Sequence, residues 1–136
     1  MGIEWDESYA VGVDIIDAQH KELFSQISGL IDAMKASRGK ERVCEVIGFL
    51  ESYIRFHFAT ETRLMDEHGY PAAAAHLEEH ADFVRLFRAL REELVLSGPS
   101  PTLAISLNNQ ICNWLIRHVL GTDRPLGAFL RTVRPK

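Results

Sequence analysis

The chain has 136 residues, of which 46% are hydrophobic and 25% charged, and this composition predicts one globular domain over residues 1–136 with a full apolar core. Its formal net charge of -4, with no cluster of lysine and arginine, argues against nucleic acid as a partner. The acidic first residues do not resemble a secretory signal, and no apolar run has the length of a membrane span. We therefore expect a cytoplasmic protein without a membrane partner.

The two cysteines, Cys44 and Cys112, have no Cys-x-x-Cys spacing, which favours reduced thiols in the cytosol over a disulfide or a metal site. Each lies beside an apolar stripe rather than on it. We expect both to be small, buried, apolar residues.

The first 16 residues carry aromatic and aliphatic side chains without a regular period, and they predict an arm that packs across the rest of the domain. Asp14 or Asp17 is a candidate cap for the helix that follows. That helix is predicted over residues 17–36, with an inward stripe that recurs every three or four residues. The stripe consists of His20, Leu23, Phe24, Ile27, Leu30, Ile31 and Met34. A turn over residues 37–40 is expected to end the helix.

A second helix is predicted over residues 41–67, and it ends at the turn Gly69-Tyr70-Pro71. Its inward stripe consists of Val43, Ile47, Leu50, Ile54, His57, Glu61 and Leu64. His57 and Glu61 therefore face the core, where an ionised carboxylate is costly unless a cation or several donors meet it. His68 lies off the stripe, and we interpret it as a surface or capping residue.

A third helix is predicted over residues 72–96, and it has the most regular pattern in the chain. Its stripe consists of Ala73, His76, His80, Phe83, Phe87, Leu90 and Leu94. His76 and His80 share one face, at the spacing with which a helix offers two imidazoles to one metal ion.

A fourth helix is predicted over residues 102–120, with the stripe Ala104, Leu107, Ile111, Trp114 and His118. We expect Gly121 to break this helix, so that Asp123 lies just past its end. Residues 125–132 then predict a short carboxy-terminal helix.

Four helices of about 18 to 27 residues joined by short loops predict an all-α protein, an antiparallel up-down-up-down four-helix bundle with an amino-terminal arm. In such a bundle the inward histidines of all four helices and Glu61 come to the same end, and Asp123, just beyond the fourth helix, lies there too. Together they are His20, His57, Glu61, His76, His80, His118 and Asp123. These seven candidate ligands are too many for one tetrahedral zinc ion, so a two-metal centre with bridging carboxylates fits better.

Imidazole and carboxylate ligands suit iron, with manganese or zinc as alternatives. Ferritin-like diiron enzymes use several glutamates and Glu-x-x-His pairs, and the two helices that carry the most candidate ligands lack that spacing. Because neutral imidazoles stabilise high-valent iron less than carboxylates do, this histidine-rich set favours oxygen binding over oxygen cleavage.

From Trp5 to about Leu130, the chain resembles the single-domain bacterial hemerythrins. The matching motifs are Asp17-x-Gln19-His20, His57-Phe58-x-x-Glu61 with Leu64-Met65, Tyr70-Pro71, His76-x-x-x-His80, and Trp114-Leu115-x-x-His118 with Asp123.

The resemblance implies that His76, His80 and His118 bind one iron ion. It further implies that His20 and His57 bind a second iron ion, and that Glu61 and Asp123 bridge the two beside an oxo or hydroxo bridge. Oxygen would bind at an open position on the iron with two histidines. Leu115, one turn before His118, would line the oxygen pocket.

The expected function is reversible oxygen binding rather than catalysis, for storage, delivery or sensing, with an oxygen-using enzyme or a reductase as a partner. A diiron redox enzyme that uses the same centre, such as a peroxidase or a nitric oxide or oxygen reductase, remains the alternative. A third hypothesis is an iron store, although two ions per chain would be a small capacity.

Overall fold

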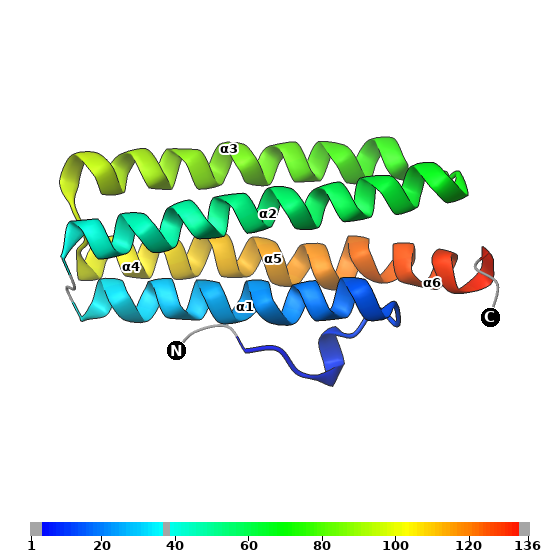
Figure 1. The fold of residues 1–136 in the computed structure, drawn as a ribbon, viewed down its shortest axis with the longest axis horizontal. Coiled ribbons are helices and arrows are strands. Elements are labelled where there is room, and N and C mark those ends of the chain that lie inside the picture. Colours follow the sequence, from blue (N-terminus) through cyan, green and yellow to red (C-terminus); the bar gives the residue numbers. More distant parts are fainter. Residues whose placement is uncertain (1–3, 37–38, 134–136) are drawn as a thin grey trace.

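Four long helical rods lie side by side in the computed structural model, which describes residues 4–36 and 39–133 (Figure 1). The first three rods are α1 (Asp14–Lys35), α2 (Lys40–His68) and α3 (Ala73–Ser97). The fourth rod is built from α4 (Pro101–Leu107), η2 (Asn108–Cys112), α5 (Asn113–His118), η3 (Val119–Asp123) and α6 (Arg124–Val133). Neighbouring rods run in opposite directions, which confirms the predicted all-α bundle.

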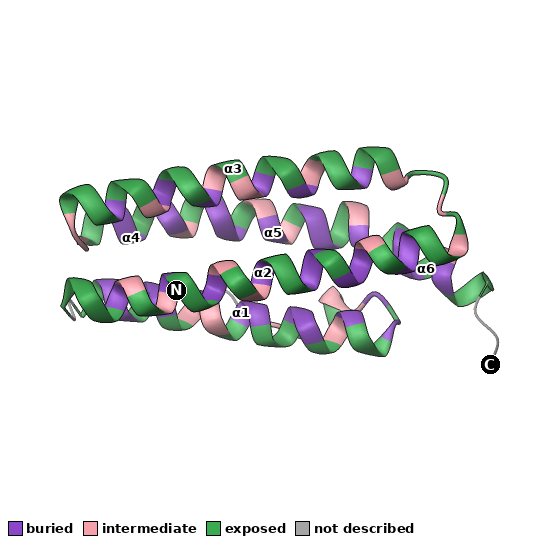
Figure 2. Cartoon of the chain, turned by 45° about the horizontal axis from the view of Figure 1, so that its top comes forward, coloured by how far each residue is buried: buried purple, intermediate pink, exposed green. Residues whose placement is uncertain are grey.

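The inward stripes of the rods form one continuous core, seen as buried bands along the facing sides of the helices (Figure 2). All the predicted stripe residues of α1 and α2 are buried. On the other two rods, Ala73 and Trp114 are the half-buried exceptions. The 3.6-residue period therefore identified the core-facing side of each helix correctly.

The fourth rod corrects the sequence prediction, because Gly121 does not end it. The backbone passes from α5 through the π-helical turn η3 directly into α6. A glycine lowers helix stability by only about 1 kcal/mol. Continuing the helix carries Leu126 and Leu130 into the core, where both are fully buried, and that burial outweighs the cost of the glycine.

The amino-terminal arm lies beside α1 (Figure 1), contacts α6 and includes the short 3₁₀ helix η1 (Glu7–Tyr9). Val11 and Val13 are buried in the core. Arg124 Nη2 donates a hydrogen bond of 2.7 Å to the carbonyl oxygen of Ser8. A Cβ atom at Gly127 would collide with the carbonyl oxygen of Val11, so this close approach requires glycine.

The start of α1 differs from the prediction, since the helix begins at Asp14 rather than near residue 17. Its N-cap, Val13, makes no side-chain capping bond. Asp17 instead accepts hydrogen bonds from the backbone N–H groups of Val11 at 2.8 Å and Gly12 at 3.2 Å. Asp17 therefore ties the arm to α1 rather than capping the helix.

The two cysteines differ in burial, although both were expected to be buried. Cys112 is buried, and burial raises the pKa of its thiol to about 11. Cys44 is only half-buried, because it lies at the edge of the stripe on α2, so the prediction for it was wrong.

His68 is the half-buried last residue of α2. Of the predicted turn over residues 37–40, Ser37 and Arg38 lie outside the described residues.

Among residues 4–36 and 39–133, no helix is both long and apolar enough to cross a membrane.

Candidate metal centre

Seven polar side chains meet inside the bundle, near the end where α2 turns into α3. They are His20 from α1, His57 and Glu61 from α2, His76 and His80 from α3, His118 from α5 and Asp123 from η3. Each residue is at most 5% exposed. The structure thus brings together every candidate metal ligand expected from the sequence.

The π-helical turn η3 explains how His118 and Asp123 can face the same point. In an α-helix, successive residues are rotated by about 100°, so residue i+5 points about 140° away from residue i. The wider π turn, which closes i→i+5 hydrogen bonds, returns the fifth residue to the same face. Asp123 therefore enters the cluster from within a continuous helix, whereas the sequence predicted a position just past the helix end.

The two oxygens of Glu61 face different histidines. Oε1 lies 3.0 Å from Nε2 of His76 and 3.0 Å from Nε2 of His80. Oε2 lies 3.2 Å from Nε2 of His57 and 3.7 Å from Nε2 of His20. The carboxylate thus spans two separate groups of imidazoles.

The two carboxylate oxygens of Asp123 also face different histidines. Its Oδ1 lies 3.1 Å from Nε2 of His76 and 3.2 Å from Nε2 of His118, while its Oδ2 lies 3.0 Å from Nε2 of His20. When two ligand atoms each lie about 2.1 Å from a metal ion and form a right angle at it, they are about 3.0 Å apart. The spacings therefore fit metal coordination, and Glu61 and Asp123 belong to both groups of possible ligands.

Several atoms of the cluster have no hydrogen-bond partner among the described residues, although they lie within contact distance of one another. These atoms include Nε2 of His20 and His118, Oε2 of Glu61, and both carboxylate oxygens of Asp123. Unpaired buried polar atoms are costly. Glu61 Oε1 lies within hydrogen-bond distance of His76 and His80, but the atoms named above converge without such bonds, which fits metal ions better than a network of hydrogen bonds.

The pKa values of the metal-free cluster reflect this crowding. Burial by itself lowers the pKa of His20 and His76, but contacts with Asp123 and Glu61 outweigh it and raise both values to about 9. Burial raises the pKa of the carboxyls of Glu61 and Asp123, yet the surrounding histidines hold both below their ordinary values. The pKa of His80 is lowered, mainly by burial. Without metal, the carboxylates therefore draw protons onto some of the imidazoles.

Two histidines also make a hydrogen bond through Nδ1, and their partners are not themselves candidate ligands. His57 Nδ1 lies 2.7 Å from Oε1 of Gln19, whose Nε2 donates to Thr60 Oγ1 at 3.1 Å. His118 Nδ1 lies 2.7 Å from Oε1 of Glu79. Because an amide oxygen and a carboxylate can only accept, each Nδ1 carries the hydrogen, and Nε2 presents its lone pair to the cluster.

The contact of Glu79 with His118 could not be predicted from the sequence. It lies next to His80 on α3, off the inward stripe, so its position along the helix resembles that of any surface glutamate. Only the approach of the fourth rod brings it to His118. Burial raises the pKa of Glu79, but hydrogen bonds from His118 and Thr122 outweigh that effect and lower it.

Aromatic rings cover two of the histidines. Phe58 stacks on His80, with ring centroids 3.8 Å apart and an interplanar angle of 2°. Trp114 stacks on His118, at 4.5 Å and 16°. These rings restrict the rotation of the two imidazoles and exclude water from one side of each.

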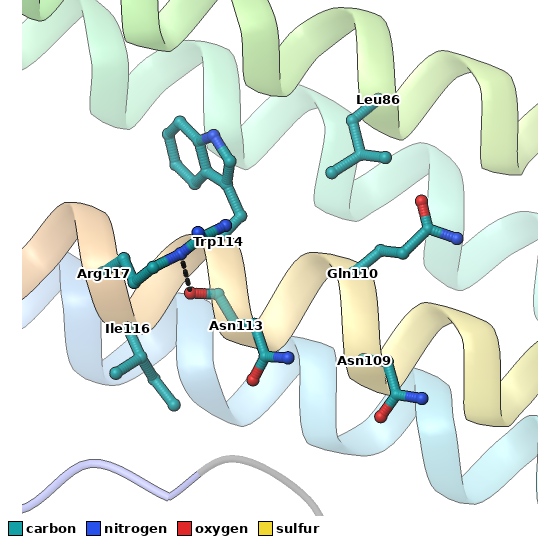
Figure 3. A pocket seen from close by; sticks show the side chains of 7 residues that line it. All are labelled: Leu86, Asn109, Gln110, Asn113, Trp114, Ile116 and Arg117. Carbon is teal, nitrogen blue, oxygen red and sulfur yellow. Dashed lines mark hydrogen bonds between the residues drawn. The ribbon is translucent and has the colours of Figure 1, made fainter.

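A surface hollow of about 540 Å³ lies beside Trp114 (Figure 3). Its lining consists of Leu86, Asn109, Gln110, Asn113, Trp114, Ile116 and Arg117. Figure 3 also marks the hydrogen bond from Arg117 Nε to the carbonyl oxygen of Asn113, at 3.4 Å. None of the seven cluster residues lines the hollow, so we do not assign it as the oxygen site.

The fold and the cluster define a four-helix-bundle protein with a buried, histidine-rich candidate metal centre. Residues 11–130 match the family Hemerythrin, described as the hemerythrin HHE cation binding domain. The chain therefore belongs to the hemerythrin family.

Individual relatives agree with this assignment. The bacteriohemerythrin of Stenotrophomonas maltophilia is 31% identical over 120 residues, which cover 88% of this chain and 76% of that protein. The myohemerythrin of Theromyzon tessulatum is 28% identical over 120 residues, covering 88% and 87% of the two chains. A crystal structure of wild-type hemerythrin has a TM-score of 0.82 at 24% identity, covering 94% of this chain and 97% of that one, and it supports the fold alone.

Proposed function

We propose that this protein binds molecular oxygen reversibly at a non-haem diiron centre. His76, His80 and His118 would hold one iron ion, and His20 and His57 the other. Glu61 and Asp123 would bridge the two ions beside an oxo or hydroxo bridge. The pair of ferrous ions supplies the two electrons that oxygen takes up on binding and returns on release.

The observation that carries this proposal is the unequal division of the seven side chains. One group offers five ligand atoms and the other offers four, with Glu61 and Asp123 common to both. If each ion has about six coordination positions and the two share a solvent bridge, the ion with two histidines keeps one position free. An open position on one ion of the pair is what oxygen binding requires.

The residues around the cluster support reversibility. Gln19 and Glu79 fix the orientation of two imidazoles through their Nδ1 atoms. Phe58 and Trp114 cover two imidazole faces. Surroundings that exclude water and hold the imidazoles rigidly keep protons and water away from the bound oxygen. Without this protection, the oxygen would leave in a reduced form and the iron would remain oxidised.

The chain belongs to a family of oxygen-binding proteins rather than of enzymes. We therefore assign oxygen binding in preference to catalysis by a peroxidase or a reductase. Storage, or delivery to an oxygen-using enzyme, ranks above sensing. Free thiols at Cys44 and Cys112 favour a cytoplasmic location.

The function is tested by the optical spectrum of the iron-loaded protein, reduced without oxygen and then exposed to air, with the iron counted in the same sample. We expect a colourless reduced form and two iron ions per chain. A visible charge-transfer band should appear in air and disappear under vacuum over repeated cycles. A spectrum that passes directly and permanently to the ferric form would reject the carrier function and would favour the redox enzyme.

Replacing Leu115 with serine tests the proposed wall of the oxygen pocket. The hydroxyl group would admit water close to the centre, and we expect irreversible oxidation in air to become about tenfold faster, equivalent to about 1.4 kcal/mol in the barrier. The rate is measured as loss of the visible band. Leu107→Ser is the matched control, because Leu107 and Leu115 lie on the same rod and are both 2% exposed. Equal oxidation rates in the two variants would remove Leu115 from the pocket.

A further inference from the structure

His57 and His118 make Nδ1 hydrogen bonds of the same length with chemically different partners. Gln19 Oε1 lies 2.7 Å from His57 Nδ1, and Glu79 Oε1 lies 2.7 Å from His118 Nδ1. One partner is a neutral amide and the other is a carboxylate. His57 belongs to the group with two histidines and His118 to the group with three.

Glu79 is fixed in place by more than its contact with His118. Thr122 Oγ1 lies 2.9 Å from Oε1 and 3.0 Å from Oε2 of Glu79, so its hydroxyl donates to the carboxylate. Thr122 lies on η3 beside Asp123, and it therefore connects Glu79 to the turn that carries a bridging ligand. The Glu79 side chain is 42% exposed, which keeps it hydrated and negatively charged, whereas His118 is only 3% exposed at its side chain.

The charge of the partner changes what the imidazole can donate. A carboxylate that accepts the Nδ1 hydrogen pulls that proton away from the ring and increases the electron density at Nε2. A charge-assisted hydrogen bond is roughly twice as strong as a neutral one, so the amide of Gln19 has a smaller effect on His57. A more electron-rich ligand stabilises the higher oxidation state of the metal ion that it holds.

We propose that Glu79 makes the two metal positions electronically unequal, by stabilising the ferric state of the ion held by three histidines. Gln19 leaves the ion with two histidines, where oxygen would bind, more readily ferrous. Glu79 touches neither metal nor oxygen, so it is a positioning residue that acts through His118. This inference rests on the proposed diiron function.

The proposal predicts where the first electron is lost during stepwise oxidation. When ferricyanide oxidises the fully reduced protein, one ferrous ion loses one electron, and ferricyanide is reduced to ferrocyanide. We expect that ion to be the one held by His76, His80 and His118.

The test uses two reciprocal substitutions that nearly preserve shape, and each exchanges a carboxylate and an amide. Glu79→Gln replaces the carboxylate with a neutral amide whose oxygen can still accept from His118, and it should make the first oxidation less favourable by about tenfold in its equilibrium constant. Gln19→Glu adds a carboxylate behind His57 and should make oxidation of the ion with two histidines more favourable. Glu78→Gln is the matched control, because Glu78 is an exposed neighbour on the same helix. The measurement is a ferricyanide titration of the iron-loaded protein under nitrogen.

A second readout is independent of iron and of oxygen. In the zinc-loaded protein, the nitrogen-15 chemical shifts of the His118 ring should change in Glu79→Gln and stay constant in Glu78→Gln. Thr122→Val releases Glu79 without removing its charge, and it should shift the same signals in the same direction by a smaller amount.

The outcomes separate this inference from the function on which it rests. If Glu79→Gln matches the original protein in both measurements and only Glu79→Ala is impaired, Glu79 has a purely structural role and the proposal is overturned. If the potentials and the ring signals shift as expected while the optical cycle in air fails, the carrier function is wrong and the electronic role of Glu79 stands.

Discussion

Replacement of Glu61 with glutamine is expected to abolish binding of both metal ions. An amide offers one oxygen where the carboxylate offers two, and its N–H₂ group would face one of the two groups of imidazoles instead of a cation. Because Oε1 faces His76 and His80 while Oε2 faces His57, either orientation of the amide damages one metal position. If Glu61 bridges the two ions as proposed, its loss would weaken the binding of both. We expect a fall in metal affinity well beyond the roughly 10–100-fold that is typical of residues behind the ligands.

The measurement is metal content per chain after dialysis against a weak chelator, together with the optical band in air. Glu51→Gln is the control, since Glu51 lies on the same helix α2 but pairs with Arg91 and Arg55 at the surface. That control should keep its full metal content. Retention of two ions by Glu61→Gln would show that Glu61 is not a bridging ligand.

Removal of the metal ions is expected to lower the thermal midpoint of unfolding by about 10 to 20 °C. Two ions, each present at about 30 times its dissociation constant, together stabilise the folded state by about 4 kcal/mol. For a chain of this size, each kcal/mol corresponds to roughly 3–5 °C. The measurement is thermal unfolding followed by circular dichroism, before and after chelation.

The size of this difference should depend on pH. In the metal-free protein the pKa values of His20 and His76 are raised from 6.5 to about 9, so their stabilising contribution is complete below pH 6.5 and is lost as the pH rises through about 9. The lowered pKa values of Glu61 and Asp123 give stability that is present above their ordinary values and lost in acid.

Metal-bound imidazoles are already neutral, so the loaded protein does not lose that contribution in base. The difference in midpoint between loaded and metal-free protein should therefore widen from pH 6 to pH 9. A difference that narrows over this range would contradict protonation of the imidazoles in the metal-free cluster.

Much of the candidate centre followed from the spacing of residues along single helices. The inward stripes included five histidines and Glu61, and the structure brings all of them together with Asp123. Their roles as ligands remain a prediction. This part was accessible because helical periodicity is a local property, and because short loops require neighbouring helices to be antiparallel.

Other features could not be derived in this way. The arm residue Val11 is buried although the arm has no helical period, because Val11 contacts α6 more than 100 positions away. Gly121 appeared to be a helix breaker, yet the buried side chains beyond it keep the rod continuous. The position of Glu79 in the sequence did not indicate its contact with His118.

The sequence alone determined the helical class, the side of each helix that faces the core, and the end of the bundle where the histidines meet. These follow from the 3.6-residue period and the cost of burying charge, both of which act within one helix. The tertiary structure alone decided that Asp123 enters through a π turn, that each carboxylate divides its oxygens between two groups of imidazoles, and that Glu79 reaches His118. These depend on distances of about 3 Å between different helices, and packing sets such distances only once all four rods are in place.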